Sequence, residues 1–404
     1  MSKRVKNPED EHLILVAAAA RMRGDGKTQA QIAKKLIKSQ PEVSRLIADA
    51  VEHDFLARSP AFLSWNVKQS IRDEVDRRYY VPEKLRNKLR DLAPAKLYLD
   101  VHLLPDGDDA FAEAAAECVV DLLRHSQVAG IMYGRTLERM VSRVKGCVAG
   151  RSKRESHEIQ CIPLCGDPVH LMNRGQVNFS ASHLAAQLGN AVRNEDSDGA
   201  SQPALVLEPA LAGVPAYFGR KFYEKDKAAA GWRKFVEEIP GYRAIFGRGD
   251  GRERAWIARL DTVISGAGII AKNNPKQTQN EPPDGKAALE KTGDFIIERL
   301  KQEEDLVSES GLAKLIYGDM GGWLIARPNL KASDQSIVEQ LNKGWTGIDG
   351  KALGEVAKSA RSGGAPGVIL VAAGKAKADM VREIVRQGLV NVLLIDLSLG
   401  TALS

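Results

Sequence analysis

The sequence predicts an α/β protein of two modules, an all-α module at the N-terminus followed by a larger α/β module. The chain has 404 residues, 44% hydrophobic and 27% charged, enough for about two or three domains. Residues 1–90 carry 19 Lys and Arg against 12 Asp and Glu, a balance of +7, and the remaining residues carry 39 against 40, a balance of −1. Short helical patterns fill the basic part, whereas two apolar runs of strand length flank a helical pattern near the C-terminus.

Composition narrows the class of protein further. No apolar run reaches the ~18–20 residues of a membrane span, and the N-terminus has no apolar signal segment. Four cysteines are too few for a disulfide framework, which agrees with a reducing compartment. We therefore expect a cytoplasmic protein. A basic segment next to a neutral one fits either phosphate binding or a solvated surface, and charge alone does not separate the two.

The basic part contains three predicted helices. Residues 12–23 form an Ala-rich pattern that ends at Gly24 and Gly26. Thr28 can cap a second helix over 28–36. Ser39 and Glu42 have the spacing of a capping box and open a third helix. The apolar positions of the last two helices are Ile32, Ala33 and Leu36, then Val43, Leu46, Ile47 and Ala50.

Two short helices with a tight break between them predict a helix-turn-helix, which could carry a wing. A plain helical hairpin is the alternative. A recognition helix enters the major groove by its N-terminal end, so Gln40 could read adenine and Arg45 could read guanine or hold a phosphate. The predicted DNA contacts are Thr28, Gln29, Lys38, Ser39, Gln40, Glu42, Ser44 and Arg45, with Lys27, Lys34 and Lys35 as further phosphate contacts.

The segment TQAQIAKKLIKSQPEVSRLI, residues 28–47, resembles the helix-turn-helix of the SorC family of bacterial sugar-responsive transcriptional regulators. The matching positions are Gln29, Ile32, Ala33, Leu36, Ser39, Val43, Ser44, Arg45 and Leu46. Ile37 and Lys38 stand where the family prefers Gly and an apolar residue, and Gln40 replaces a frequent Arg. The resemblance implies DNA binding. The departures at Ile37 and Lys38 bear on the shape of the turn, and the departure at Gln40 bears on the operator sequence.

The larger module shows the strand and helix patterns of an α/β domain. Residues 97–104 predict a strand, 110–126 a helix, and 128–141 a strand, a Gly-Arg-Thr turn and a helix start. Helix-start N–H groups beside Gly134, with the Thr136 hydroxyl, can form an anion site. An ordinary α/β turn is the alternative.

Near the C-terminus, GVILVAA and VNVLLID flank a helical segment and predict a βαβ unit of a buried parallel sheet. Residues just beyond the carboxyl ends of such strands line a ligand crevice, which places Gly374, Lys375, Lys377 and Asp396 there. Lys377 would suit an anionic, phosphate-bearing ligand. An exposed helix lysine and, for Asp396, a strand-end cap are the alternatives.

Several segments of this module resemble the sugar-binding domain of the same family. They are the GRTL sequence at 134–137, IQCIPLCGD at 159–167, RLDTVISGAGII at 259–270, GDMGGWLI at 318–325 and the stretch from 367 onward. The resemblance implies a fold like sugar-phosphate isomerases and deaminases, with sensing in place of catalysis. The implied effector-binding residues are Gly134, Arg135, Thr136, Gly166, Asp167, Gly266, Gly268, Asp319, Lys377 and Asp396.

The expected organisation is a helix-turn-helix domain over 1–60, a helical linker over 61–95 and an effector-binding and oligomerisation domain over 96–404. Within the linker we expect helices over about 66–79 and 83–92. Polar stretches near 220–254 and 272–290 are expected insertions. The spacing of His157, Cys161, Cys165 and His170 could suggest zinc, but strand alternation orients such ligands poorly, so we expect no metal and no cofactor.

We therefore expect a regulator, not an enzyme, that binds a palindromic double-stranded DNA operator and self-associates to a dimer or tetramer. When bound to DNA it would lie at the bacterial nucleoid. Its effector would be a phosphorylated sugar or polyol or a related small molecule. The sequence leaves repression or activation open. The alternatives are an active sugar-phosphate isomerase or deaminase, and a DNA-binding protein without a ligand.

Overall fold

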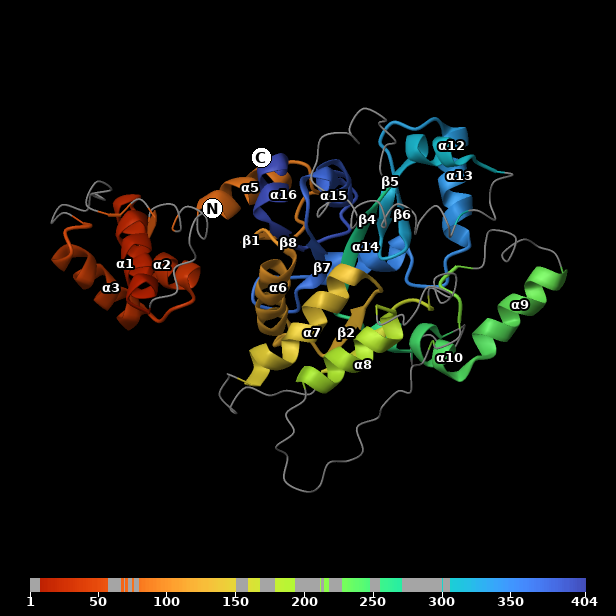
Figure 1. Cartoon of the computed structure of the whole chain (residues 1–404), viewed down its shortest axis with the longest axis horizontal. Coiled ribbons are helices and arrows are strands. Elements are labelled where there is room, and N and C mark those ends of the chain that lie inside the picture. The colour runs from red at the N-terminus through yellow and green to blue at the C-terminus, as the bar shows by residue number, and fades with distance from the viewer. Residues whose placement is uncertain are drawn as a thin grey trace, which may run out of the picture. The chain divides into compact units, whose positions relative to one another are not determined.

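The computed structural model describes residues 8–56, 67–68, 70–71, 75, 80–149, 159–167, 179–192, 211, 214–217, 227–247, 255–270, 300 and 306–404. The chain divides into two compact units, Met1–Asn87 and Lys88–Ser404. The division falls inside helix α5, Val81–Arg90, within the segment 61–95 that was expected to link the modules. Figure 1 shows both units, and each is described by itself below.

The N-terminal unit is built around helix α1, Pro8–Gly24, against which α2, Gln29–Leu36, and α3, Gln40–Glu52, pack. α1 is Ala-rich, and its small side chains allow the other helices to approach closely. The buried core contains residues of all three helices: Ile14, Val16, Ala17, Ala18, Ala19, Ala20, Met22, Ile32, Ala33, Leu36, Val43, Leu46 and Ala50. The pair α2 and α3 is the predicted helix-turn-helix.

Both predicted helix starts are confirmed. The Thr28 hydroxyl accepts the N–H of Gln31 at 3.3 Å, and the Gln31 side chain returns to the Thr28 N–H at 2.9 Å. At α3 the Ser39 hydroxyl accepts the N–H of Glu42 at 3.4 Å, and the Glu42 carboxylate accepts the Ser39 N–H at 2.8 Å. Each box satisfies two backbone groups that a helix start otherwise leaves without partners.

The segment after α3 is described only in part. Residues 57–66, where a wing would begin, lie outside the described residues, as does most of the helix predicted over 66–79. Val67, Ile71 and Val75 are described and are buried in the core of the N-terminal unit. The second predicted linker helix, expected over 83–92, is α5.

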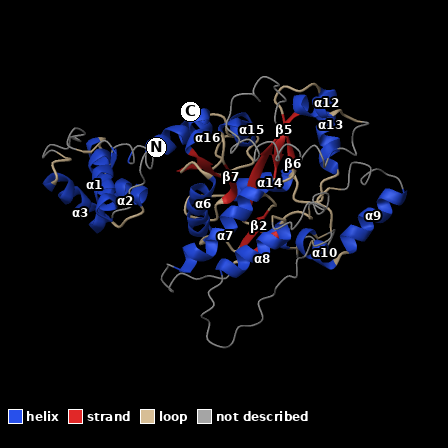
Figure 2. Ribbon diagram, in the orientation of Figure 1, coloured by secondary structure: helices blue, strands red, loops and turns tan. Residues whose placement is uncertain are grey.

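The second unit contains one sheet whose main path is six parallel strands in the order β1-β8-β7-β4-β2-β3. Figure 2 shows this sheet in red among the helices. The strands are β1 Asp100–Leu104, β2 Val128–Ile131, β3 Gln160–Pro163, β4 Thr262–Ile269, β7 Gly367–Ala372 and β8 Val392–Asp396. β7 and β8 are buried along their whole length, and both appear in the sequence as continuous apolar runs.

Helices cover both faces of the sheet. On one face lie α6 Asp108–Leu123, α7 Arg135–Ala149 and α8 Ala181–Val192, packed on inward side chains such as Ile131, Ile264 and Leu394. The helices α14 Gly350–Ser359, α15 Ala378–Arg386 and α16 Leu397–Leu403 contact the strands as well. β7 and β8 pair in parallel with α15 between them in sequence, so the predicted βαβ unit is confirmed.

The motif at 318–325 adopts a structure that the sequence analysis did not predict. β5, Ile316–Met320, and β6, Trp323–Ala326, form an antiparallel hairpin that extends the sheet from the end of β4. A Cβ at Gly318 would lie 1.9 Å from the Gly268 carbonyl oxygen, and one at Gly322 would lie 1.9 Å from the Trp345 ring. Both glycines are therefore required by close approach to a neighbouring group.

The remaining elements lie outside the parallel strands. They are α9 Lys227–Glu238, α10 Pro240–Phe246, the 3₁₀ turns η7 Trp256–Arg259 and η9 Lys375–Lys377, α12 Glu309–Leu315 and α13 Ala332–Lys343. The described part of the expected insertion near 220–254 contains the helices α9 and α10. The Tyr242 hydroxyl of α10 donates to the Thr346 carbonyl at 3.2 Å. The other expected insertion, 272–290, lies outside the described residues. Within the described part, no helix has the length and apolar character to cross a membrane.

Candidate functional site

The N-terminal half of α3 presents polar side chains that the fold leaves free. Gln40, Ser44 and Arg45 are exposed, as is Gln29 at the start of α2. None of these four side chains makes a hydrogen bond or ion pair with another described residue. In a helix-turn-helix, exposed side chains without a partner at the start of the second helix can contact the edges of bases in the major groove.

The other predicted DNA contacts are engaged within the unit. Thr28, Ser39 and Glu42 hold the two capping boxes, and the hydrogen bonds from Ser39 lower the pKa of Glu42. Lys38 lies 3.6 Å from the Glu42 carboxylate. Both partners are largely solvated, so this ion pair is weak and leaves Lys38 able to reach a phosphate. Ser39 and Glu42 fix the start of α3.

Lys35 is half-buried, unlike Lys34, which is the other lysine of α2 and is exposed. Its ammonium group pairs with Glu83 at the start of α5 and lies 5.2 Å from the centre of the Tyr80 ring. The Arg21 guanidinium lies 3.8 Å from the same ring centre, and the Tyr80 hydroxyl donates to Asp25 at 2.8 Å. Burial and the Asp25 carboxylate raise the pKa of Tyr80. The start of α5 is thus attached to α1 and α2 by charged contacts.

In the second unit, several predicted effector residues meet where the parallel strands end. We call this end of the sheet the carboxyl edge. β4 pairs in parallel with β7 at Gly266 and then in antiparallel with β5, where Gly268 stands opposite Asp319. Asp319 is buried, and the Tyr133 hydroxyl, which follows β2, lies 3.5 Å from its carboxylate. β2, β4 and β5 therefore converge on one group of polar side chains.

Lys377 belongs to the same group. It follows β7 and is half-buried, and burial lowers its pKa to about 8, while Asp396, Asp319 and Asp108 act in the opposite direction. Within the described part of the chain the Lys377 side chain has no hydrogen bond and no ion pair. Partial burial of a cation without a direct partner carries a desolvation cost, and an anionic ligand would stabilise such a group.

Asp396 has a structural role that the sequence analysis had kept as an alternative. Its carboxylate caps α16 by accepting the N–H of Leu399 at 3.0 Å. Both carboxylate oxygens also accept the N–H of Gly374, each at 3.0 Å. The Ser398 hydroxyl donates to it at 2.8 Å. Asp396 therefore fixes the turn that precedes Lys377.

The Gly-Arg-Thr segment forms the start of α7. Gly134 has φ of +153° and precedes the helix, so Arg135 and Thr136 occupy its first turn rather than a free loop. The Gly134 N–H donates to the carbonyl of Phe179 at 3.0 Å, and the exposed Arg135 guanidinium lies 5.9 Å from the Phe179 ring centre. The Thr136 hydroxyl makes no hydrogen bond to another described residue.

Gly166 and Asp167 are held mainly by a different part of the chain. The Asp167 N–H donates to the Val214 carbonyl at 2.6 Å, and a Cβ at Gly166 would lie 2.2 Å from that same oxygen. Asp167 is buried. The preceding Cys165 packs in one cluster with Tyr133 and Trp345. The structure thus brings this pair near Tyr133.

The sequence matches no protein-family profile and no curated protein sequence. The fold, however, aligns with the full-length sorbitol operon regulator SorC of Klebsiella pneumoniae over 97% of this chain and 98% of that chain, with a TM-score of 0.51 and 14% identity. The chain has the SorC fold. A transcriptional regulator of Streptococcus pneumoniae TIGR4 aligns over 79% of this chain and 94% of its own, with a TM-score of 0.48 and 14% identity.

A probable sor operon regulator of Shigella flexneri aligns over 80% of this chain and 99% of its own, with a TM-score of 0.46 and 12% identity. The alignment with the Klebsiella protein covers both the helical N-terminus and the parallel α/β sheet. The predicted fold class is therefore confirmed, and the resemblance to SorC regulators is confirmed at the level of the fold.

The structure adds residues that the sequence analysis missed. The negative charge of Asp108 raises the pKa of Lys377, against the effect of burial. The rings of Tyr133 and Trp345 pack together with their centres 6.0 Å apart. Asp108 and Tyr133 both follow a strand of the parallel sheet, so the rule that placed Lys377 at the carboxyl edge could have found them. Trp345 follows a helix, α13, rather than a strand, so that rule does not mark it as a residue of the site.

The cysteines near the suggested zinc spacing lie apart in the core. Cys161 packs among the helices α7 and α8, whereas Cys165 packs with Tyr133. His157 and His170 lie outside the described residues. No group of three metal-binding side chains occurs in the part of the chain that the structure describes.

Proposed function

We propose that the chain is a DNA-binding transcriptional regulator of the SorC type, whose affinity for its operator is set by a small molecule bound at the carboxyl edge of the sheet. The observation that carries the proposal is the doubly capped helix-turn-helix with free Gln40, Ser44 and Arg45, in a chain that has the fold of a full-length regulator. The nearby solved structures are of regulators. Residues 1–60 would bind DNA and residues 96–404 would bind the effector and self-associate.

The expected DNA is a duplex with two-fold symmetry. One helix-turn-helix reads only a short half-site, and a pair of chains related by a two-fold axis would read two half-sites about 34 Å, one helical turn, apart or a multiple of that. Gln40 would contact adenine, and Arg45 would contact guanine or a phosphate. Lys27, Lys34 and Lys38 would add phosphate contacts.

The expected effector carries both hydroxyl groups and a negative charge. Carboxylates such as Asp319 accept hydrogen bonds from sugar hydroxyls, and the half-buried Lys377 would hold a phosphate. The start of α7, with Arg135 and Thr136, would offer N–H groups and a hydroxyl to further oxygen atoms of the effector. A phosphorylated sugar or polyol combines these features.

The DNA part of the proposal is tested by selecting duplexes from a random pool with the full-length chain. Arg45→Ala should weaken binding to the selected duplex by about 1–3 kcal/mol if Arg45 reads a base. Arg361→Ala is the matched control, because it removes the same charge from an exposed position in the second unit. Failure to enrich any duplex would refute DNA binding, and equal affinities of the two variants would remove Arg45 from the interface.

The effector part is tested by thermal unfolding of the full-length chain with hexose phosphates, polyol phosphates and their unphosphorylated forms. A ligand that binds the folded state should raise the midpoint of unfolding in proportion to the logarithm of its concentration. The stabilising ligand should then change the affinity for the selected duplex, because an effector that prefers one state shifts the population toward it. Turnover of any of these compounds would instead support an enzyme.

A further inference from the structure

Ile37 stands out on the surface of the N-terminal unit. It lies in the turn between α2 and α3, and 91% of the residue is exposed. The other exposed large apolar residues among those described are Val51 and Val81 at 40% and Phe235 at 58%. An apolar side chain that nothing in the fold covers does not contribute to the core of this unit.

The backbone of Ile37 is also unfavourable for its side chain. The residue has φ of 54° and ψ of 48°, the left-handed conformation, and it ends α2. Its N–H and that of Lys38 both donate to the Ala33 carbonyl, the arrangement that usually places glycine at this position. A β-branched residue is a true outlier with positive φ. The chain does use glycine at comparable positions elsewhere, with φ of 80° at Gly26 and 69° at Gly388.

The position of Ile37 indicates what would contact it. It directly precedes Lys38, Ser39 and Gln40, which are exposed and lead into the recognition helix. This is the end of α3 that enters the major groove in a helix-turn-helix complex. The surrounding exposed side chains are polar or basic, so the surface as a whole fits nucleic acid better than the apolar core of a protein interface.

We propose that Ile37 makes an apolar contact with the 5-methyl group of a thymine in the major groove and so contributes to the choice of operator. The inference rests on the proposed DNA binding of α3. The thymine methyl is the apolar group that a base pair presents in the major groove. The contact would explain why a strained and exposed isoleucine occupies a position where glycine is favoured.

The contact is tested with the selected duplex and the full-length chain. Each thymine is replaced in turn by deoxyuridine, which removes the methyl group and leaves the hydrogen-bonding edge unchanged. For the wild type, one such replacement in each half-site should weaken binding by about fourfold, the effect of one buried methyl group. The same replacement should have no effect on the affinity of Ile37→Gly.

The Ile37→Gly variant separates recognition from folding. Glycine removes the strain at positive φ, so hydrogen exchange across residues 29–52 should be unchanged or slower, while the affinity for the thymine duplex should fall about fourfold or more. Val51→Ala is the control, since it trims an exposed apolar side chain near the C-terminal end of α3, away from the start of the helix. Its affinity should equal that of the wild type.

The outcomes distinguish this inference from the proposed function. If the wild type selects no duplex, DNA binding itself fails. If the wild type binds but Ile37→Gly shows the same affinity and the same dependence on the thymine methyl, the contact with Ile37 is refuted. A loss of affinity in Ile37→Gly that leaves the methyl dependence intact would also refute it, because the turn's flexibility would then be responsible.

Discussion

At the scale of single residues, Lys377 differs from the other lysines at the carboxyl edge. Its neighbour Lys375 is exposed, whereas Lys377 is half-buried and has its pKa lowered by burial to about 8. Two of the carboxylates that raise the pKa of Lys377 already have other partners. Asp396 caps α16, and Asp108 forms an ion pair with Arg139. An incoming anion would therefore not have to displace an existing ion pair from Lys377.

This environment predicts how effector binding depends on pH. An anionic ligand favours the charged ammonium, so the pKa of Lys377 should be higher in the complex than in the free protein. Affinity should then be constant below about pH 7 and fall as the pH rises through about 8, by up to tenfold per unit, until the pKa of the complex is reached. Titration calorimetry from pH 7 to 9.5 measures this, above the range in which a phosphate itself titrates.

Variants of the two lysines provide the comparison. Lys377→Met should bind the phosphorylated ligand weakly and show no pH dependence over this range. Lys375→Ala should keep the wild-type profile. A wild-type affinity that does not change between pH 7 and 9.5 would show that the charge of Lys377 does not contribute to binding.

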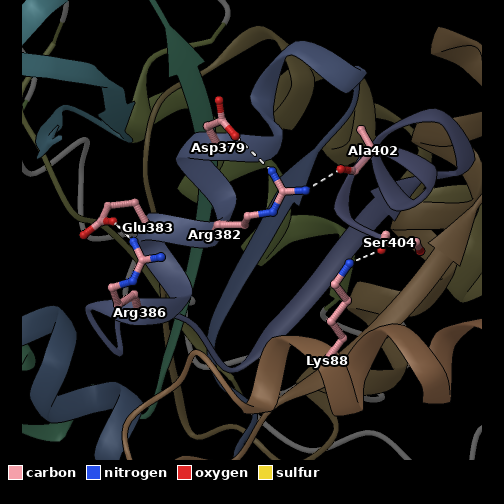
Figure 3. A network of polar contacts seen from close by, with 7 residues as sticks. All are labelled: Lys88, Asp379, Arg382, Glu383, Arg386, Ala402 and Ser404. Carbon is pink, nitrogen blue, oxygen red and sulfur yellow. Dashed lines mark hydrogen bonds and ion pairs between the residues drawn. The ribbon is translucent and has the colours of Figure 1, made fainter. Parts of the chain in front are cut away.

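At the scale of elements, the last helix depends on contacts from other parts of the second unit. α16 has only seven residues, too few to be stable alone. Asp396 holds its start, while Arg382 donates to the Ala402 carbonyl at 2.5 Å and Lys88 donates to the carbonyl of Ser404. Figure 3 shows the two cations at the end of the helix, one from α15 and one from α5. Cations there satisfy free carbonyls and oppose the helix dipole.

Removing the cap should loosen α16 specifically. Asp396→Ala removes the acceptor for Leu399 and for Gly374 and should cost about 1–2 kcal/mol locally. Hydrogen exchange of residues 397–404 should accelerate correspondingly, by about 5–30-fold. Asp396→Asn is the control, because Asn is an equally good N-cap, and it should restore most of the protection. Equal exchange in the alanine variant and the wild type would show that the cap does not limit opening of this helix.

At the scale of the whole molecule, local signals predicted the fold better than long-range ones. The capping boxes at Thr28 and Ser39 and the apolar runs of β7 and β8 involve residues close in sequence, so their patterns are visible in the chain itself. The pairing of Gly268 with Asp319 joins β4 and β5, segments about fifty residues apart in the sequence, and neither this pairing nor the β5-β6 hairpin was predicted. The influence of Asp108 on Lys377 likewise appears only once β1 and β7 lie in one sheet. The sequence located the carboxyl edge, whereas the arrangement of charges within it required the structure.

The uneven distribution of charge along the chain predicts how DNA binding depends on salt. The first 90 residues carry the whole positive excess, so the counterions released on binding should come from contacts in this part of the chain. Lys34 is exposed on α2 and has no partner among the described residues, which makes it a candidate phosphate contact. Lys34→Ala should weaken binding to all duplexes to a similar degree and should reduce the slope of log affinity against log salt by about 1.

A lysine of the second unit provides the matched control for this salt titration. Lys358 is exposed on α14, and Lys358→Ala removes the same charge while leaving the basic part of the chain unchanged. Its slope and affinity should equal those of the wild type if the second unit makes no phosphate contacts. A slope that falls equally in both variants would mean that the net charge of the whole chain, rather than specific contacts of α2 and α3, sets the affinity for DNA.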